Sequence, residues 1–234
     1  AYLKKSLAGL RTDISGKMVC SAIKGIVPED NYIVGDYFHK KLDVPLKNMV
    51  ILTGPTHSEE IAMEKLTYLT LASPDKSAAQ KISGLLANHY LKTIISDDIT
   101  GTEYAAVIKN IYAIAAGMAD GLGYGDNFLA VLLSNSANEM KRFIKAVYMN
   151  DRDFNSSPYL GDLLVTAYSK FSRNRMFGNM IGRGYSVKYT MMEMEMVAEG
   201  YYSSDCINAI NQRLKVDLPI ADTVHRILYH KADP

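Results

Sequence analysis

Residues 100–125 read TGTEYAAVIKNIYAIAAGMADGLGYG, and the character of the chain changes at this stretch. Its apolar residues recur at spacings of four, three, four and three, as they do along one face of a helix; they are Tyr104, Ile108, Ile111, Ala115 and Met118. Glycines at positions 121, 123 and 125 then interrupt the pattern. The stretch therefore predicts a helix over residues 100–119 that ends at a glycine-rich turn.

Downstream of this helix the sequence predicts only further helices. They are expected near residues 127–148, 158–170, 174–181, 191–199, 205–213 and 220–229. No strand signal of comparable strength occurs there. Residues 99–234 are therefore predicted to form an all-helical domain.

Upstream of the helix, short apolar runs alternate with helical segments. An opening helix is followed by predicted strands at residues 18–23, 48–53, 66–72 and 91–96, with helices at residues 58–65 and 77–88. Strands that alternate with helices are typical of an α/β layer built on a parallel sheet. Residues 1–98 are therefore predicted to form an α/β domain, which gives the chain an α/β part followed by a mainly α-helical part.

Composition narrows the class of protein. The 234 residues are 48% apolar and 22% charged, which is typical of a globular protein and excludes a disordered one. The net charge of +1 gives no indication of nucleic-acid binding. No apolar run approaches the roughly 20 residues of a membrane span, and no signal peptide opens the chain, so we expect a cytoplasmic protein. The two cysteines and five histidines have no metal-ligand spacing, and no metal is expected.

Lys109 is the first candidate functional residue, because it interrupts the apolar helix. No carboxylate lies three or four residues away, so a helix-local ion pair is excluded. The side chain either occupies a thin solvent face, which the residue pattern alone favours, or points into a cleft. In a cleft, desolvation would lower the pKa of the ammonium toward the range useful for proton transfer. Asp162 is of interest because Lys109 needs a distant anionic partner.

Two further candidate segments follow predicted strands, where open α/β sheets gather their ligands. Lys24 could meet a phosphate there, or it could simply end the strand in solvent. The segment Gly54–Ser58 precedes a helix, so Thr56 or Ser58 is either a helix cap or part of a ligand site.

The last candidates lie in the helical part. Ser172-Arg173-Asn174-Arg175 places two guanidiniums around an asparagine, which suits a phosphate clamp, and an ordinary helix start capped by Ser172 explains it equally well. Asp162 and Glu199 each adjoin a glycine at a helix end and could be caps or surface charges.

Taken in order, these segments resemble the bacterial-type NAD(P)-dependent glycerol-3-phosphate dehydrogenases. The matching stretches are SAIKG at 21–25, GPT at 54–56, VIKN at 107–110, AAGMADGLGYG at 115–125, LGDL at 160–163, SRNR at 172–175 and VAEGY at 197–201. Each stretch is unspecific on its own. All seven occur in the order and with the spacing of the family, and together they cover essentially the whole chain.

The resemblance implies a reaction and roles for residues. It implies that dihydroxyacetone phosphate, a small phosphorylated substrate, is reduced to sn-glycerol 3-phosphate with NADH or NADPH, for phospholipid synthesis. Lys109 matches the catalytic lysine, which exchanges a proton with the ketone oxygen. The implied substrate contacts are Lys24, Gly54, Thr56, Lys109, Asp162, Ser172, Arg173 and Asn174, and the implied cofactor contacts are Lys24, Ser58, Arg173, Val197 and Glu199. A homodimer is also implied.

One family feature is missing from these 234 residues. The family opens with a strand, a GxGxxG-type turn and a helix that bind the pyrophosphate of the dinucleotide, and no GxGxxG occurs here. We therefore expect an incomplete Rossmann-like sheet that lacks roughly the first third of a two-domain enzyme, binds cofactor poorly and is inactive alone. Two alternatives stay open: a dehydrogenase acting on a 3-hydroxy acid, and a noncatalytic dimerisation or binding module.

Overall fold

The computed structural model of the chain describes residues 2–194 and 198–234. The chain divides into two compact units, Ala1–Tyr104 and Ala105–Pro234, and the division falls inside the long helix α5 (Ile99–Gly121). The predicted fold class is confirmed, since an α/β unit precedes a mainly helical one. The predicted domain boundary after residue 98 stays a prediction.

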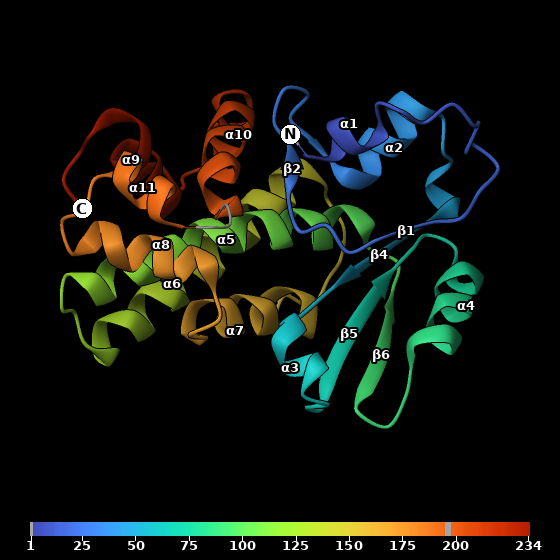
Figure 1. Ribbon diagram of the computed structural model, residues 1–234, viewed down its shortest axis with the longest axis horizontal. Coiled ribbons are helices and arrows are strands. Elements are labelled where there is room, and N and C mark those ends of the chain that lie inside the picture. The colour runs from blue at the N-terminus through green and yellow to red at the C-terminus, as the bar shows by residue number, and fades with distance from the viewer. Residues whose placement is uncertain (1, 195–197) are drawn as a thin grey trace. The chain divides into compact units, whose positions relative to one another are not determined.

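The first unit is built on a four-stranded sheet (Figure 1). Its strands are β1 (Val19–Ser21), β4 (Met49–Thr53), β5 (Thr67–Ala72) and β6 (Leu91–Ser96), in the order β1-β4-β5-β6. All four were predicted, and the bounds of β6 agree at both ends. Strand β1 is parallel to β4, and β5 is parallel to β6, but β4 and β5 are antiparallel.

The lengths of the connecting helices account for this mixed pattern. The connection from β5 to β6 holds the 11-residue helix α4 (Lys76–Leu86), which is long enough for a parallel crossover. The connection from β4 to β5 holds only the five-residue helix α3 (Ser58–Ala62). That segment turns the chain back, and β5 therefore runs against β4.

Several small elements complete this unit. Helix α1 (Tyr2–Leu7) is shorter than the predicted opening helix. The segment between β1 and β4, for which no element was predicted, contains four more elements. They are a short hairpin of β2 (Ile26–Val27) and β3 (Tyr32–Ile33), the helix α2 (Val34–Leu42) and a 3-10 turn (Leu46–Asn48).

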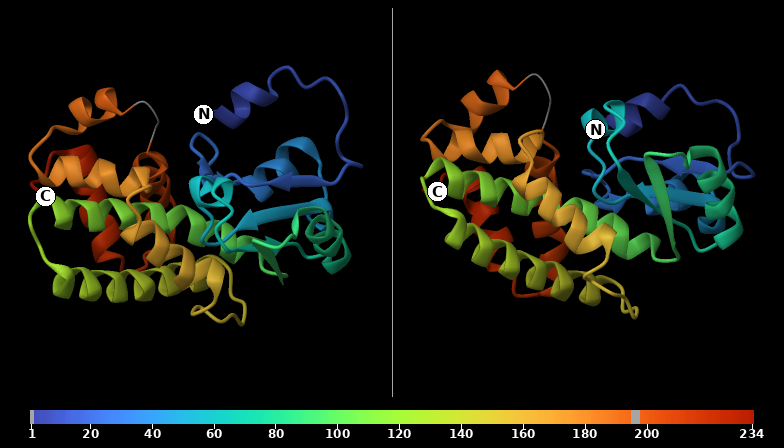
Figure 2. Two further views of the ribbon diagram at one scale, coloured as in Figure 1. Left: turned by 60° about the horizontal axis from the view of Figure 1, so that its bottom comes forward. Right: turned by 90° about the horizontal axis from the view of Figure 1, so that it is seen from below.

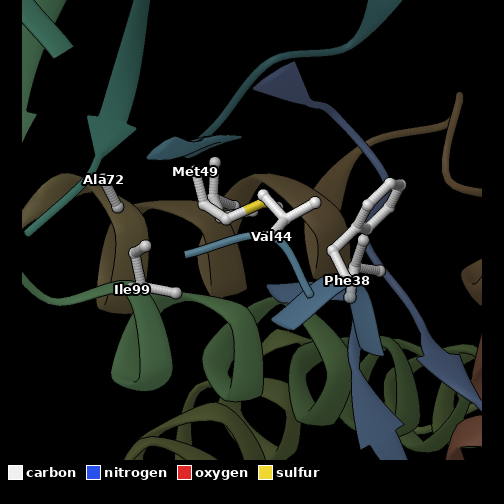
Figure 3. Close-up of a cluster of buried hydrophobic side chains, with 7 residues drawn as sticks. Phe38, Val44, Met49, Ala72 and Ile99 are labelled. Atoms are coloured by element: carbon white, nitrogen blue, oxygen red, sulfur yellow. The ribbon is translucent and has the colours of Figure 1, made fainter. Parts of the chain in front are cut away.

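Strand β4 is buried on both faces of the sheet. Met49 and Ile51 of β4 pack into a cluster with Phe38 of α2 and Ile99 of α5 (Figure 3). Val50, which lies between Met49 and Ile51 and points the opposite way, packs into a second cluster beneath α4. Burial on both faces explains why β4 reads as an unbroken apolar run in the sequence.

A buried carboxylate anchors the start of α2. Glu103 is only 3% exposed, and each of its carboxyl oxygens lies 3.1 Å from the backbone nitrogen of Gly35, which donates to them. A Cβ at Gly35 would lie 2.7 Å from Glu103 Oε2, so a side chain at this position would displace the carboxyl group. Burial raises the pKa of Glu103 from an ordinary value of 4.5 to about 8.

This raised pKa predicts a pH dependence of stability. The folded chain holds the proton on Glu103 below about pH 8, whereas the unfolded chain releases it above about pH 4.5. The contribution of Glu103 to the free energy of unfolding is therefore fully present below about pH 4.5 and is lost as the pH rises through about 8. Urea titrations across this window should give a shallower fall in stability for Glu103→Gln than for the wild type. Equal slopes for the two proteins would contradict the assignment.

The second unit consists of helices in its described residues. They are the rest of α5, α6 (Asp126–Val147), a π-helical turn (Ser157–Gly161), α7 (Asp162–Tyr168), α8 (Arg173–Gly182), α9 (Val187–Glu193), α10 (Glu199–Leu214) and α11 (Pro219–His230). The predicted helix over residues 191–199 is wrong, because α9 ends at Glu193 and α10 begins at Glu199.

Helix α5 is the central element of this unit. The sequence predicted one apolar stripe, but every residue from 105 to 119 is buried, so the helix is covered all round. Figure 2 shows α6 and α8 running alongside it. No helix of the described residues is both long enough and apolar enough to cross a membrane.

Four glycines bring α5 and α8 into backbone contact. Gly117 and Gly121 of α5 face Gly178 and Gly182 of α8, with the same spacing of four residues on each helix. A Cβ at Gly178 would lie 2.0 Å from the carbonyl oxygen of Ile114, and one at Gly117 would lie 2.0 Å from that of Arg175. Side chains are therefore excluded from this crossing, and the glycines of the quoted stretch serve helix packing as well as the turn.

Candidate active site

Lys109 lies inside the second unit, on the buried part of α5. Its side chain is 4% exposed, and the solvent-face interpretation that the residue pattern favoured is wrong. Nζ donates hydrogen bonds to Asp162 Oδ1, with which it forms a salt bridge, and to Thr166 Oγ1 at 2.9 Å. The distant anionic partner expected for Lys109 is therefore Asp162.

Helix α7 supplies both partners of Lys109. Asp162 is its first residue and is 1% exposed, and Thr166 lies one turn later on the same face. The Thr166 hydroxyl donates to the main-chain oxygen of Asp162 at 2.6 Å and accepts from Lys109. The three side chains thus form a buried hydrogen-bonded group that fixes the position of the ammonium.

Thr166 was missed by the sequence analysis. The signal that could have found it is the spacing of four residues between Asp162 and Thr166, which places both on one helix face. Threonine in a helix bonds back to the carbonyl of residue i−4 so often that the spacing alone does not separate a site from ordinary helix structure.

Replacing Thr166 with valine tests its contribution. The nearly isosteric change removes the acceptor for Lys109, so we expect about 1 kcal/mol of lost stability together with slower turnover in any reaction in which Lys109 takes part. Thr190→Val is a matched control, because the buried Thr190 hydroxyl donates to the Ser186 carbonyl oxygen at 3.0 Å on a different helix, α9. Equal turnover for both variants would show that Thr166 has only a structural role.

The SRNR segment forms the start of α8, and its members have separate functions. Ser172 is the N-cap, and its hydroxyl oxygen accepts from the Arg175 backbone N–H at 3.2 Å. Arg175 pairs with Asp120 of α5 at 3.1 Å, so its guanidinium is used in helix packing. Arg173 is exposed. The clamp of two guanidiniums stays a prediction, in which Arg173 is the exposed cation and Arg175 is already paired with Asp120.

The start of α10 adjoins this segment. The side-chain oxygen of Asn174 accepts from the Gly200 backbone N–H at 2.8 Å. Glu199 begins α10, and the expectation that it lay near the end of a helix is wrong. Glu199 as a whole residue is exposed, but partial burial of its carboxyl group raises the pKa of that group. The nearby Arg173 guanidinium acts in the opposite direction and lowers the pKa. Val197 lies outside the described residues.

Three predicted residues come together in the first unit. Lys24 follows β1, and its Nζ donates to the Gly54 carbonyl oxygen at 2.6 Å and to Thr56 Oγ1 at 3.1 Å. Gly54 has a φ of 101°, a conformation that favours glycine. The Thr56 hydroxyl donates to the Gly54 carbonyl oxygen at 3.1 Å. These contacts join the ends of β1 and β4, the two parallel strands of this part of the sheet.

Ser58 is the first residue of α3 rather than its cap. The N-cap position is His57, with no side-chain capping bond, and the Ser58 hydroxyl donates to its neighbour Glu59 at 3.1 Å. The capping alternative is therefore wrong for both Thr56 and Ser58. In the described part of the chain, no cluster of three or more His, Cys, Asp or Glu side chains could hold a metal ion.

Comparisons with known proteins show the family of the chain. Residues 98–234 match the family described as NAD-dependent glycerol-3-phosphate dehydrogenase C-terminus, and residues 2–79 match its N-terminus. The glycerol-3-phosphate dehydrogenase [NAD(P)+] of an Exiguobacterium species is 35% identical over 92% of this chain and 64% of its own length. That of Listeria monocytogenes is 36% identical over 90% of this chain and 62% of its own length.

Solved structures show the same fold. The crystal structure of glycerol-3-phosphate dehydrogenase from Coxiella burnetii superposes with a TM-score of 0.87 at 30% identity, over 92% of this chain and 65% of that one. A structure from Dunaliella salina gives a TM-score of 0.88 at 24% identity, over 100% of this chain and 42% of that one, and supports the fold alone. This chain thus spans somewhat under two thirds of the bacterial relatives. The matched families cover both units, and the chain belongs to the NAD-dependent glycerol-3-phosphate dehydrogenase family.

Proposed function

We propose that the whole protein reduces dihydroxyacetone phosphate to sn-glycerol 3-phosphate with NADH or NADPH. The observation that carries this proposal is the buried group of Lys109, Asp162 and Thr166, in a chain of this family. Relatives named glycerol-3-phosphate dehydrogenase [NAD(P)+] support the same reaction. Neither a 3-hydroxy-acid dehydrogenase nor a noncatalytic module is favoured by these findings.

In this proposal Lys109 supplies the proton. As the carbonyl carbon of the substrate accepts a hydride, its oxygen gains negative charge, and the Lys109 ammonium transfers a proton to that oxygen. In the reverse direction the neutral amine takes the proton back. The Asp162 carboxylate stabilises the charged form of Lys109 and, with Thr166, holds Nζ in one position.

Other residues of the chain would bind the charged parts of substrate and cofactor. Asp162, Ser172, Arg173 and Asn174 are the proposed substrate contacts in the helical unit, with Arg173 holding the phosphate, and Lys24, Gly54 and Thr56 are proposed substrate contacts in the α/β unit. The chemistry of these donors suits a phosphate dianion, because cations and N–H groups predominate among them.

The residues proposed to hold the cofactor are Lys24, Ser58, Arg173 and Glu199. The exposed Arg173 guanidinium suits a phosphate of a dinucleotide, and the Glu199 carboxylate suits a hydroxyl or amide donor. When bound, NADH or NADPH supplies the hydride. The glycine-rich pyrophosphate turn is not part of these 234 residues.

Replacing Arg173 with alanine tests the phosphate contact. Loss of one charged hydrogen bond should weaken binding of dihydroxyacetone phosphate by about 1.5–3 kcal/mol, which calorimetry or the KM would reveal. Arg183→Ala is the matched control, because this arginine is also exposed and lies at the opposite end of α8. An unchanged dissociation constant in Arg173→Ala would remove Arg173 from the phosphate site.

A spectrophotometric assay tests the reaction itself. NADH and NADPH oxidation would be followed with dihydroxyacetone phosphate, using this chain beside a version extended to the full length of the relatives. We expect turnover in the extended protein and none in the 234-residue chain. Absence of turnover in both would argue against the substrate. A homodimer and a cytoplasmic location remain parts of the proposal.

A further inference from the structure

A hollow of about 550 Å³ lies between α6 and the start of α11, within the helical unit. It is lined by Asn135, Asn138, Glu139, Lys141, Arg142, Lys145, Pro219 and Ile220. None of these residues belongs to the site proposed above. Its volume falls within the range of small-molecule sites, about 300–1,000 Å³.

The hollow carries a concentration of positive charge. Lys141 and Lys145 lie one turn apart on α6, with Arg142 beside them, and all three are exposed. In the part of the chain that the structure describes, neither lysine has an ion pair with a carboxylate. Like charges four residues apart destabilise a helix by about 0.2–0.5 kcal/mol, and an anion bound between them would reverse this repulsion.

The one carboxylate in the lining does not neutralise this charge. Glu139 is 1% exposed, and its oxygens accept from the backbone N–H groups of Ile220 at 2.7 Å and Ala221 at 3.2 Å. These two N–H groups belong to the first turn of α11, so the carboxyl group of Glu139 is directed at the positive end of that helix and not at the cations. The three cations of the lining therefore outnumber its one carboxylate, which is already bound to the start of α11.

Arg142 is held in place before any ligand arrives. Its Nε and Nη2 donate to the Asp217 carbonyl oxygen at 3.0 and 2.8 Å, and the Asp217 carboxylate is 3.8 Å away and 85% exposed on its side chain. Two of the five guanidinium N–H groups are used in this way, and the others can serve a ligand. A fixed guanidinium loses little conformational entropy when it binds an anion.

We propose that this hollow binds a phosphate-bearing small molecule. Lys141, Arg142 and Lys145 bind the phosphate group, whose two negative charges match closely spaced cations. The amides of Asn135 and Asn138 both donate and accept hydrogen bonds, so they suit the hydroxyl or carbonyl groups of the rest of the molecule.

The experiment is an NMR titration of ¹⁵N-labelled protein with inorganic phosphate and then pyrophosphate, at an ionic strength kept constant with sodium chloride. The Arg173→Ala background weakens phosphate binding at the proposed active site. We expect saturable shifts of the amide signals of α6 and Ile220, with tighter binding of pyrophosphate. The double variant K141A/K145A should raise the dissociation constant about tenfold or more, the effect of losing one or two charged hydrogen bonds.

A matched double variant, R183A/K188A, loses the same charge from exposed positions outside the hollow and should bind as the Arg173→Ala background does. Shifts that do not saturate, or that are equal in K141A/K145A and R183A/K188A, would overturn the proposal. Sedimentation velocity tests whether a second copy of the chain occupies the hollow instead. A change of oligomeric state in K141A/K145A without saturable phosphate binding would assign the surface to a second copy and would also overturn the proposal.

Discussion

Replacing Lys109 with methionine in the full-length enzyme is expected to lower turnover by about 10²–10⁴-fold, the usual contribution of a positioned acid or base. Methionine retains the length and apolar stem of lysine but has no proton to transfer. Substrate binding should be largely preserved, because the proposed phosphate contacts are on other residues. Steady-state kinetics would therefore show a fall in kcat with little change in KM. Turnover at the wild-type level would remove Lys109 from the proposed role.

A second variant separates catalysis from folding. In Lys109→Met the Asp162 carboxylate remains buried without its ammonium, which costs about 3–5 kcal/mol. Adding Asp162→Asn removes the isolated charge, so the double variant should be more stable in urea than Lys109→Met. Its turnover should remain lost. Recovery of turnover together with stability would mean that the single variant was inactive only because it unfolded.

Replacing Gly178 with alanine is expected to destabilise the helical unit by about 3 kcal/mol or more, at the upper end of overpacking effects. The added Cβ would lie 2.0 Å from the Ile114 carbonyl oxygen, and this atom is backbone that cannot rotate away. Helices α5 and α8 would have to separate, which would disturb the packing of residues on both. Thermal and urea unfolding followed by circular dichroism would measure the loss.

Gly125→Ala is the control for this prediction. Gly125 is in the same unit, has a φ of −84°, and has no atom within 4 Å of an added Cβ. Because it is the N-cap of α6, alanine there should cost well under the Gly178 effect, about a few tenths of a kcal/mol to 1 kcal/mol. Similar losses for the two variants would contradict the account of the helix crossing.

Local patterns were sufficient to predict most elements. Strands β4, β5 and β6 were found because apolar runs bounded by turn residues predict buried strands without tertiary information. Helix α2 was missed because the segment that contains it is short and mixed in composition. The antiparallel pairing of β4 with β5 was also missed, since strand direction depends on how the connecting segment folds.

The site was predicted from the sequence only in part. The resemblance singled out Lys109 and Asp162, and Asp162 was suspected as its partner, although 53 residues separate them. The residue pattern by itself favoured a solvent face for Lys109, because periodicity reports one apolar stripe and cannot show that other helices cover the remaining faces. Thr166 and the use of Arg175 in packing against Asp120 became evident only from contacts between helices.

By itself, the sequence determined the order and type of most elements, the family, and the residues proposed for chemistry, because these depend on local periodicity and on motifs read in order. Tertiary structure alone decided which of those residues meet. A buried lysine is stable only beside a partner supplied by another helix, and α5 approaches α8 only where both helices carry glycine. Such contacts join positions far apart in the chain, and no spacing along the sequence encodes them.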